Sequence, residues 1–119
     1  ARIYRMSEVR DRGLEAVMRE AIGIATGGTR AFGVSLDIDA VDPESAPGVN
    51  TPAAEGLDPG DLMSALRLAA TAPGFAAVEV VEYNPVVDPR GSTAALVTAA
   101  LAAALPDAVF SLRRAEPKG

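Results

Sequence analysis

Apolar and polar residues alternate from Phe32 to Asp39 with a period of two, which is the signature of a β-strand. Four apolar side chains fall on one face, and the residues between them are Gly33, Ser35, Asp37 and Asp39. The pattern therefore predicts a strand from which Asp37 and Asp39 project on the same face, one pleat apart, near the end of the strand.

Two amphipathic helices are predicted on either side of this strand. Apolar residues from Leu14 to Ala25 recur every three or four positions and form one stripe, and Gly27 suits the end of that helix. Asp58 and Pro59 are typical of a helix start, because an acidic cap precedes proline at the first helical position. This second helix is predicted to extend to Thr71.

Two further strands and a last helix complete the predicted order. A short strand is predicted over Arg2 to Met6, and a valine-rich strand over Ala76 to Tyr83. Ser92 or Thr93 is expected to cap a helix that runs to about Leu105. Strands that alternate with helices predict parallel pairing through right-handed crossovers. The expected fold class is α/β, with a three-layer α/β/α architecture around a parallel sheet.

Composition narrows the classes of partner. The net charge of -5 and the 4% aromatic content argue against a nucleic-acid partner, which needs a basic face or stacking platforms. The chain has no cysteine, which excludes disulfides and thiolate zinc sites and is compatible with the cytoplasm. The longest apolar run, from Ala94 to Leu105, is too short to span a membrane, which needs about 20 residues.

The pair of aspartates carries the candidate chemistry. Two carboxylates held one pleat apart repel each other, and a divalent cation bound by hard oxygen ligands removes that repulsion. The alternative is two solvated acids at an exposed strand end. After Asp39 the chain enters a loop stiffened by Pro43, Pro47 and Pro52. Such a loop at the carboxyl end of a strand is where open α/β sheets bind ligands.

Three stretches resemble signatures of the arginase/agmatinase/formimidoylglutamase (ureohydrolase) family. They are Ser35–Pro43 with Ala46–Gly48, Thr51–Pro52 and Gly56–Leu57; Val81–Pro85 with Asp88 and Thr93–Ala94; and Tyr4–Val9 with Gly13. The likeness covers nearly the whole chain, in the family's order and spacing. It implies an arginase-like fold, of which these residues form the carboxy-terminal portion.

The resemblance also implies roles for individual residues. Asp37 would bridge two Mn²⁺ ions and Asp39 would bind one of them, with two ions per complete active site. Glu82 matches the glutamate that receives the substrate guanidinium, and a structural salt bridge to an arginine is the alternative. Thr51 matches a threonine beside the substrate, although its hydroxyl could equally stabilise the turn. Glu82 lies beside the strand of Asp37 if the two strands are neighbours in the sheet. No separate catalytic side chain is assigned.

Two features depart from the family pattern. The family also uses histidines and further aspartates from an amino-terminal Asp-x-His-x-x-x-Asp motif, and this chain has no histidine. We therefore expect residues 1–119 to be a single portion of a larger ureohydrolase domain, inactive alone and completed by an amino-terminal part. In addition, Asn50 stands where the family usually has glycine, and Arg10 where it often has an acid.

The function that the resemblance implies is hydrolysis of a C–N bond in a guanidino substrate by metal-bound hydroxide. The arginase reaction, arginine to ornithine and urea, is preferred over the agmatinase and formimidoylglutamase reactions. The family likeness also implies a homo-oligomer, either a trimer or a hexamer.

Two interpretations from other classes compete with this one. Haloacid-dehalogenase phosphatases also carry Asp-x-Asp at a strand end, but they usually continue with Gly-Thr or a similar tight turn, whereas Ala40–Pro43 follows here. Alternatively, the chain is a non-catalytic fragment that only folds, oligomerises or complements a missing half.

Overall fold

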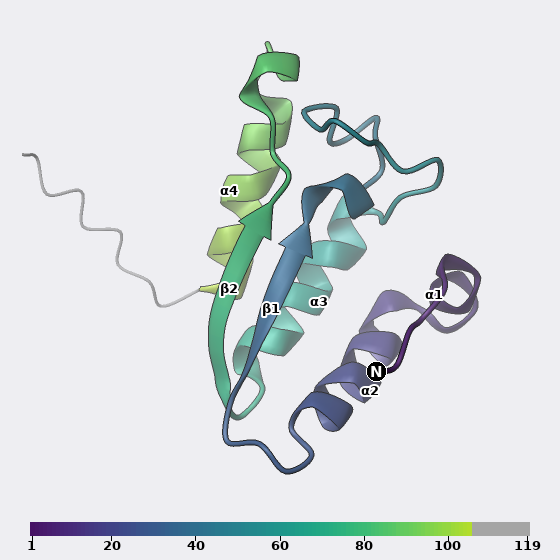
Figure 1. Cartoon of the computed structure of the whole chain (residues 1–119), viewed down its shortest axis with the longest axis vertical. Coiled ribbons are helices and arrows are strands. Elements are labelled where there is room, and N and C mark those ends of the chain that lie inside the picture. The colour runs from purple at the N-terminus through teal and green to yellow at the C-terminus, as the bar shows by residue number, and fades with distance from the viewer. Residues whose placement is uncertain (106–119) are drawn as a thin grey trace, which may run out of the picture.

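The computed structural model describes residues 1–105, in which a parallel pair of strands is packed against helices (Figure 1). Strands β1 (Phe32–Asp37) and β2 (Phe75–Val81) form a two-stranded parallel sheet. In its register Val34 lies opposite Val78, and Asp37 lies opposite Val81. Both strands therefore end at the same edge of the sheet, and the predicted α/β class with parallel pairing is confirmed.

Helix α3 (Pro59–Thr71) connects the two strands and begins as the sequence predicts. The Asp58 carboxylate accepts a hydrogen bond from the backbone N–H of Asp61 at 3.0 Å, and Pro59 occupies the first turn. Helix α4 (Ser92–Ala104) packs against α3, and both helices contact β2. None of the helices in residues 1–105 is long and apolar enough to cross a lipid bilayer.

The hydrophobic core lies between the sheet and these two helices, and it continues into the loop after β1. Leu36 from β1 and Leu62 and Leu66 from α3 are buried in one cluster. The loop adds Ile38, Val41, Ala46 and Val49 to the same cluster. The loop is therefore fixed by buried side chains, in addition to its prolines.

The opposite face of the sheet is open in the described part of the chain. Gly33, Ser35, Ala77 and Glu79 lie exposed along it. The Ser35 hydroxyl donates a hydrogen bond to Glu79 across the two strands at 2.7 Å. Small and polar residues on this face contrast with the valines and leucine of the covered face.

The strand predicted over Arg2 to Met6 is wrong. Instead, the chain enters helix α1 (Met6–Arg12), and Gly13 at φ 84° separates it from α2 (Leu14–Ala25), which has the predicted bounds. The left-handed φ at Gly13 is accessible to glycine without the clash of a Cβ atom. Helix α2 packs against α3.

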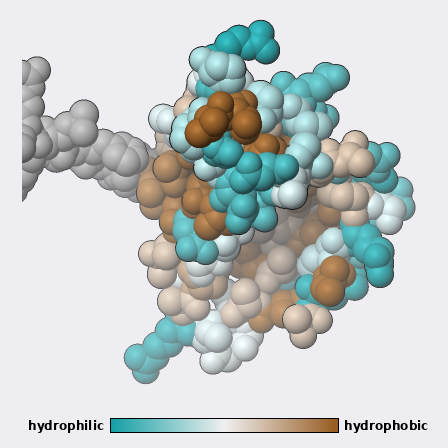
Figure 2. All heavy atoms as spheres, turned by 45° about the horizontal axis from the view of Figure 1, so that its top comes forward, coloured by the Kyte–Doolittle hydropathy of each residue, from teal (hydrophilic) through white to brown (hydrophobic). Residues whose placement is uncertain are grey.

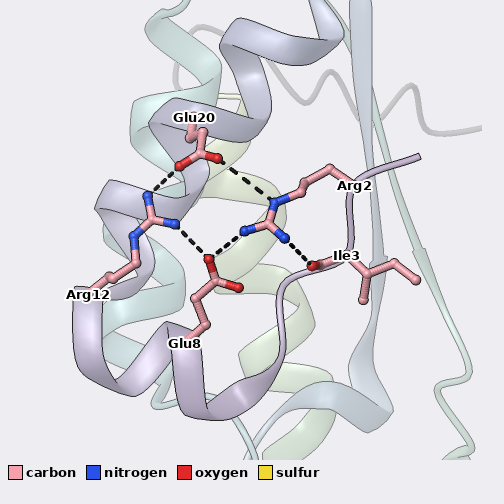
Figure 3. A network of polar contacts seen from close by, with 5 residues as sticks. All are labelled: Arg2, Ile3, Glu8, Arg12 and Glu20. Carbon is pink, nitrogen blue, oxygen red and sulfur yellow. Dashed lines mark hydrogen bonds and ion pairs between the residues drawn. The ribbon is translucent and has the colours of Figure 1, made fainter.

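A network of ion pairs joins the first residues to the helices (Figure 3). Glu8 accepts hydrogen bonds from Arg2 at 2.6 Å and from Arg12 at 2.8 Å. Arg12 also pairs with Glu20, and Arg2 Nε lies 3.9 Å from Glu20. These contacts hold the amino-terminal segment on α1 and α2 rather than beside the sheet.

Both strands end earlier than predicted, and the last helix begins slightly differently. Residues Ile38–Ala40 form a 3-10 turn, so Asp39 does not share a strand face with Asp37, and that prediction is wrong. Strand β2 ends at Val81 rather than at Tyr83. Helix α4 begins at Ser92, with Gly91 rather than Ser92 or Thr93 in the capping position.

Candidate metal and substrate site

Asp37 and Asp39 lie together where β1 passes into the 3-10 turn. Asp37 Oδ1 accepts a hydrogen bond from the backbone N–H of Asp39 at 2.9 Å, which closes the turn. The two carboxylates are therefore held close by a turn and not, as the sequence predicts, by the pleat of a strand. Asp37 is exposed and Asp39 is half-buried.

The two oxygens of the Asp39 carboxylate have different surroundings. The Thr51 hydroxyl donates a hydrogen bond to Oδ2. The other oxygen, Oδ1, is buried and has no hydrogen-bond partner among residues 1–105. A buried polar atom without a partner is unfavourable by about 1–3 kcal/mol, so a buried carboxylate oxygen of this kind suits a cation or a hydrogen-bond donor as its partner.

A divalent cation suits this pair of carboxylates. Hard oxygen ligands bind Mg²⁺, Ca²⁺ and Mn²⁺, and the unpartnered Asp39 Oδ1 can serve as such a ligand. In residues 1–105, no three or more histidine, cysteine, aspartate or glutamate side chains cluster as a metal site. The described residues therefore fit part of a ligand set.

Glu82 emerges at the same edge of the sheet, directly after β2. Because Asp37 lies opposite Val81, the last residue of β2, Glu82 follows beside the 3-10 turn, as expected for neighbouring strands. Glu82 has φ 69° and is the one described residue other than glycine with a positive φ. Left-handed backbone is unfavourable for such a residue by about 1–2 kcal/mol, and strain of this kind concentrates at functional sites.

The Glu82 side chain is exposed at this position. None of the arginines in residues 1–105 forms an ion pair with it. The described structure therefore does not contain the salt bridge that was the alternative role for this residue. Its carboxylate is oriented toward solvent at the edge where the aspartates lie.

Residues after β2 bind the loop that follows β1. The Asn84 backbone N–H donates to the Gly48 carbonyl at 2.8 Å, and Asn84 Nδ2 donates to Asn50 Oδ1 at 2.7 Å. The Gly48 N–H donates to Thr93 Oγ1 at 2.8 Å. A Cβ atom at Gly48 would lie 2.7 Å from Asp88 Cβ and 2.9 Å from Thr93 Cβ, so this close approach requires glycine.

Asp88 is the buried acid of this region, with 5% exposure. It accepts hydrogen bonds from the Tyr83 hydroxyl, the Ser92 hydroxyl and the backbone N–H groups of Thr93 and Ala94, at 2.9–3.3 Å. Burial alone raises the pKa of Asp88, but these hydrogen bonds together bring it below its ordinary value. Burial, followed by the hydrogen bond to Asp88, raises the pKa of Tyr83.

Sequence reasoning placed Asn84 and Asp88 in a family signature but gave neither a structural task. The hydrogen bonds of Asn84 reach Gly48 and Asn50, more than thirty residues away, whereas those of Asp88 lie within six residues of it. Hydrophobic periodicity carries no signal for either set. Pro85 after Asn84 and Ser92 after Asp88 indicate a turn and a helix start, which are the available local hints. The surface at this end of the molecule mixes hydrophilic and hydrophobic residues (Figure 2), and Val86 is 84% exposed.

Known proteins match this chain in sequence and in fold. A sequence model of the Arginase family matches residues 1–106. The chain belongs to the arginase family. The arginase of Bacillus caldovelox is 39% identical over 98 residues, which are 82% of this chain and 33% of that relative. The formimidoylglutamase of Bacillus subtilis strain 168 is 31% identical over 91 residues, 76% of this chain and 28% of the relative.

Solved structures of the family give the same result for the fold. The native arginase of Bacillus caldovelox superimposes with a TM-score of 0.81 at 36% identity, over 92% of this chain and 36% of that one. Formimidoylglutamase from Bacillus subtilis superimposes with a TM-score of 0.84 at 30% identity, over 88% and 33%. The arginase-like fold is therefore confirmed, and the chain spans about a third of the length of these relatives.

Proposed function

We propose that the complete protein carrying this chain is a binuclear manganese hydrolase that cleaves a C–N bond of a guanidino substrate. The preferred reaction is that of arginase, arginine to ornithine and urea. The observation that carries the proposal is Asp39 Oδ1, which is buried and has no hydrogen-bond partner among residues 1–105, at the sheet edge where Glu82 emerges. Membership of a family of hydrolases supports it.

In this proposal the chain's own residues bind and orient. Asp37 and Asp39 provide carboxylate oxygens to the cation pair, which when bound supplies Lewis-acid activation of the attacking water. The Glu82 carboxylate receives the planar guanidinium in a bidentate, charge-assisted geometry. Thr51 lies beside the substrate while its hydroxyl donates a hydrogen bond to Asp39. The strained backbone at Glu82 fixes the direction from which its carboxylate approaches the substrate.

A metal measurement tests the proposal. In the complete protein, Asp37→Asn should remove most bound manganese and nearly all turnover, because a neutral amide replaces a charged ligand. Asp11→Asn makes the same chemical change at an exposed residue of α1 and should leave both unchanged. Manganese content by elemental analysis that is the same in Asp37→Asn and the parent would sink the metal assignment.

Formimidoylglutamase activity is the second candidate, because relatives with that name match at 30–31% identity in sequence and structure. Agmatinase is a third member of the same chemical class. L-Arginine, agmatine and N-formimidoyl-L-glutamate separate them when offered one at a time to the purified complete protein. Urea is the product of the first two and formamide of the third, so a colorimetric urea assay and a formamide assay distinguish the cases.

The match to about a third of each relative supports a further part of the proposal. Residues 1–119 would be the carboxy-terminal portion of a larger ureohydrolase domain, which forms a cytoplasmic homo-oligomer of three or six subunits. The isolated 119 residues should then bind manganese weakly and release no urea. Urea production by a preparation whose intact mass contains only this chain would favour a complete site within it. Weak binding with no turnover, even after addition of the remaining portion, would favour the non-catalytic fragment.

A further inference from the structure

We propose that Asn50 and Asn84 form a clamp that positions Thr51 against the Asp39 carboxylate. The term Asn50–Asn84 clamp refers here to the hydrogen bond from Asn84 Nδ2 to Asn50 Oδ1. The inference rests on the proposed function, since it concerns the orientation of a carboxylate that would bind a cation. Asn50 and Asn84 act through Thr51 and are positioning residues.

The segment from Asn50 to Glu55 is positioned mainly by side chains, and it ends at Gly56, whose backbone packs directly against the backbone of Val41 and Asp42. None of its backbone groups forms a hydrogen bond with another backbone group of residues 1–105. Its side-chain tethers in the described structure are the clamp, the Thr51–Asp39 hydrogen bond and the pair of Glu55 with Arg10 at 2.5 Å. A loop held in this way moves when a tether is removed.

The clamp and the Thr51 contact lie on consecutive residues. Asn50 is bound to the residues after β2, and Thr51 is bound to the turn after β1. One planar peptide unit joins them, so a shift of Asn50 is transmitted to the Thr51 hydroxyl. Asn50 adopts an ordinary negative φ, so its backbone conformation does not call for asparagine or glycine. Its side chain instead accepts the hydrogen bond from Asn84.

Asn84 is anchored well enough to serve as the fixed partner. Its backbone N–H binds the Gly48 carbonyl at 2.8 Å, and its Oδ1 accepts the Val86 N–H at 2.9 Å. Gly48 is in turn bound to Thr93 on α4. The clamp therefore joins the exposed loop segment to a buried framework, and the framework stays in place when Asn50 is replaced.

The two residues that depart from the family pattern both tether this segment. Asn50 supplies one half of the clamp, and Arg10 pairs with Glu55 at the far end of the same segment. The pair with Glu55 joins it to α1, on the other side of the loop. Asn50 and Arg10 thus hold opposite ends of the segment from Asn50 to Gly56.

The consequence for the site is the orientation of Asp39. Groups that hydrogen-bond to a metal ligand fix its direction, and their loss typically weakens metal binding or activity by about 10–100-fold. Thr51 is such a group for Asp39 Oδ2, which leaves Oδ1 as the oxygen without a partner in residues 1–105. Removing the clamp loosens Thr51 without removing any ligand.

A double-mutant cycle in the complete protein tests the clamp, with Mn²⁺ alone as the titrated probe. Thr51→Val should weaken manganese binding by about 10–100-fold, and Asn50→Ala by about tenfold. The double variant should bind no more weakly than Thr51→Val, because Asn50 acts through Thr51. Asn50→Asp keeps the accepting oxygen, so its crystal structure should retain the Thr51–Asp39 hydrogen bond that the structure of Asn50→Ala loses. Glu44→Gln, an exposed residue of the same loop, is the control and should match the parent.

The outcomes separate the clamp from the proposed function. Additive effects of Asn50→Ala and Thr51→Val, or an unchanged Thr51–Asp39 hydrogen bond in the crystal structure of Asn50→Ala, would overturn the clamp even in an active enzyme. Suppose the parent protein hydrolyses no guanidino or formimino substrate, yet Asn50→Ala loses the Thr51–Asp39 hydrogen bond and its loss of manganese binding is coupled to that of Thr51→Val. That result would overturn the function and leave the clamp in place. If the protein binds no manganese, the crystal structures of Asn50→Ala and Asn50→Asp decide whether the clamp positions Thr51.

Discussion

Asp37 lies opposite Val81 in the parallel sheet, and this register brings Glu82 to the edge occupied by the aspartates. The pairing follows from the crossover through α3, which joins two short strands whose covered faces are apolar. A carboxylate on one strand can then serve metal binding while a carboxylate on its neighbour serves substrate binding. The following variants test that division.

Glu82→Gln separates the two tasks. It keeps the shape of the side chain and removes its charge, so kcat/KM for the guanidino substrate should fall by about 10–100-fold, at about 1.4 kcal/mol per decade. Manganese content should stay unchanged, because Glu82 is not expected to be a ligand. Steady-state kinetics and elemental analysis on the same preparation give both values. Loss of metal together with activity would instead make Glu82 a ligand or a fold element.

The positive φ of Glu82 predicts a stability difference between two further variants. Glycine adopts φ 69° without strain, whereas alanine keeps the clash of its Cβ atom. Glu82→Gly should therefore be more stable to urea than Glu82→Ala by about 1 kcal/mol, with both variants impaired in turnover. Equal urea midpoints for the two would show that the backbone relaxes away from the left-handed region at no cost.

Gly48 and Gly23 form a matched pair of glycine sites. Gly48→Ala places a methyl group within 3 Å of Asp88 and Thr93, and we expect a loss of about 1–3 kcal/mol from overpacking. In contrast, Gly23 lies within α2, and a methyl group at that position would meet open space. Gly23→Ala should therefore stabilise the protein by up to about 1 kcal/mol through helix propensity. Chemical denaturation measures both, and a stabilising Gly48→Ala would contradict the close packing.

Asp88 predicts an acid-sensitive contribution to stability. Its pKa is lower in the folded protein than in the unfolded chain, where it is about 3.9. The contribution is thus complete above about pH 4 and is lost as the pH falls through the lower folded value. Asp88→Asn should lower the melting temperature by several degrees at pH 7 and by less at pH 3. Asp11→Asn serves as the control, and an equal loss at both pH values would argue against a charged Asp88.

Local patterns predicted some elements well and others poorly, for physical reasons. The stripe from Leu14 to Ala25 and the cap at Asp58 depend on neighbours within one or two helical turns, and both helices match their predicted bounds. Helix α1 was missed because its seven residues are too few to show an apolar stripe, and the ion pairs that Arg2 makes with Glu8 on α1 and Glu20 on α2 follow no periodic pattern.

In the candidate site, too, some features follow from local sequence patterns and others do not. Asp37 and Glu82 were expected at one sheet edge, and the register of β1 and β2 brings them there. The turn at Ile38–Ala40 was missed because one hydrogen bond, donated by the Asp39 N–H to the Asp37 carboxylate, overrides the alternating pattern. Contacts between Asn50 and Asn84 join two loops, and sequence spacing alone does not reveal them. The roles of Asp37, Asp39, Thr51 and Glu82 remain predictions.

The contact of Gly48 with the first turn of α4 has a consequence for protein engineering. The loop from Val41 to Leu57 takes its shape from Thr93, Asp88 and Asn84 as well as from its own prolines. If that loop alone were transplanted into another scaffold, it would lose the residues that it packs against and hydrogen-bonds to. A functional graft must carry two pieces, the loop and the stretch from Tyr83 to Ala94, and substitutions at positions 48 and 93 must be chosen as a pair.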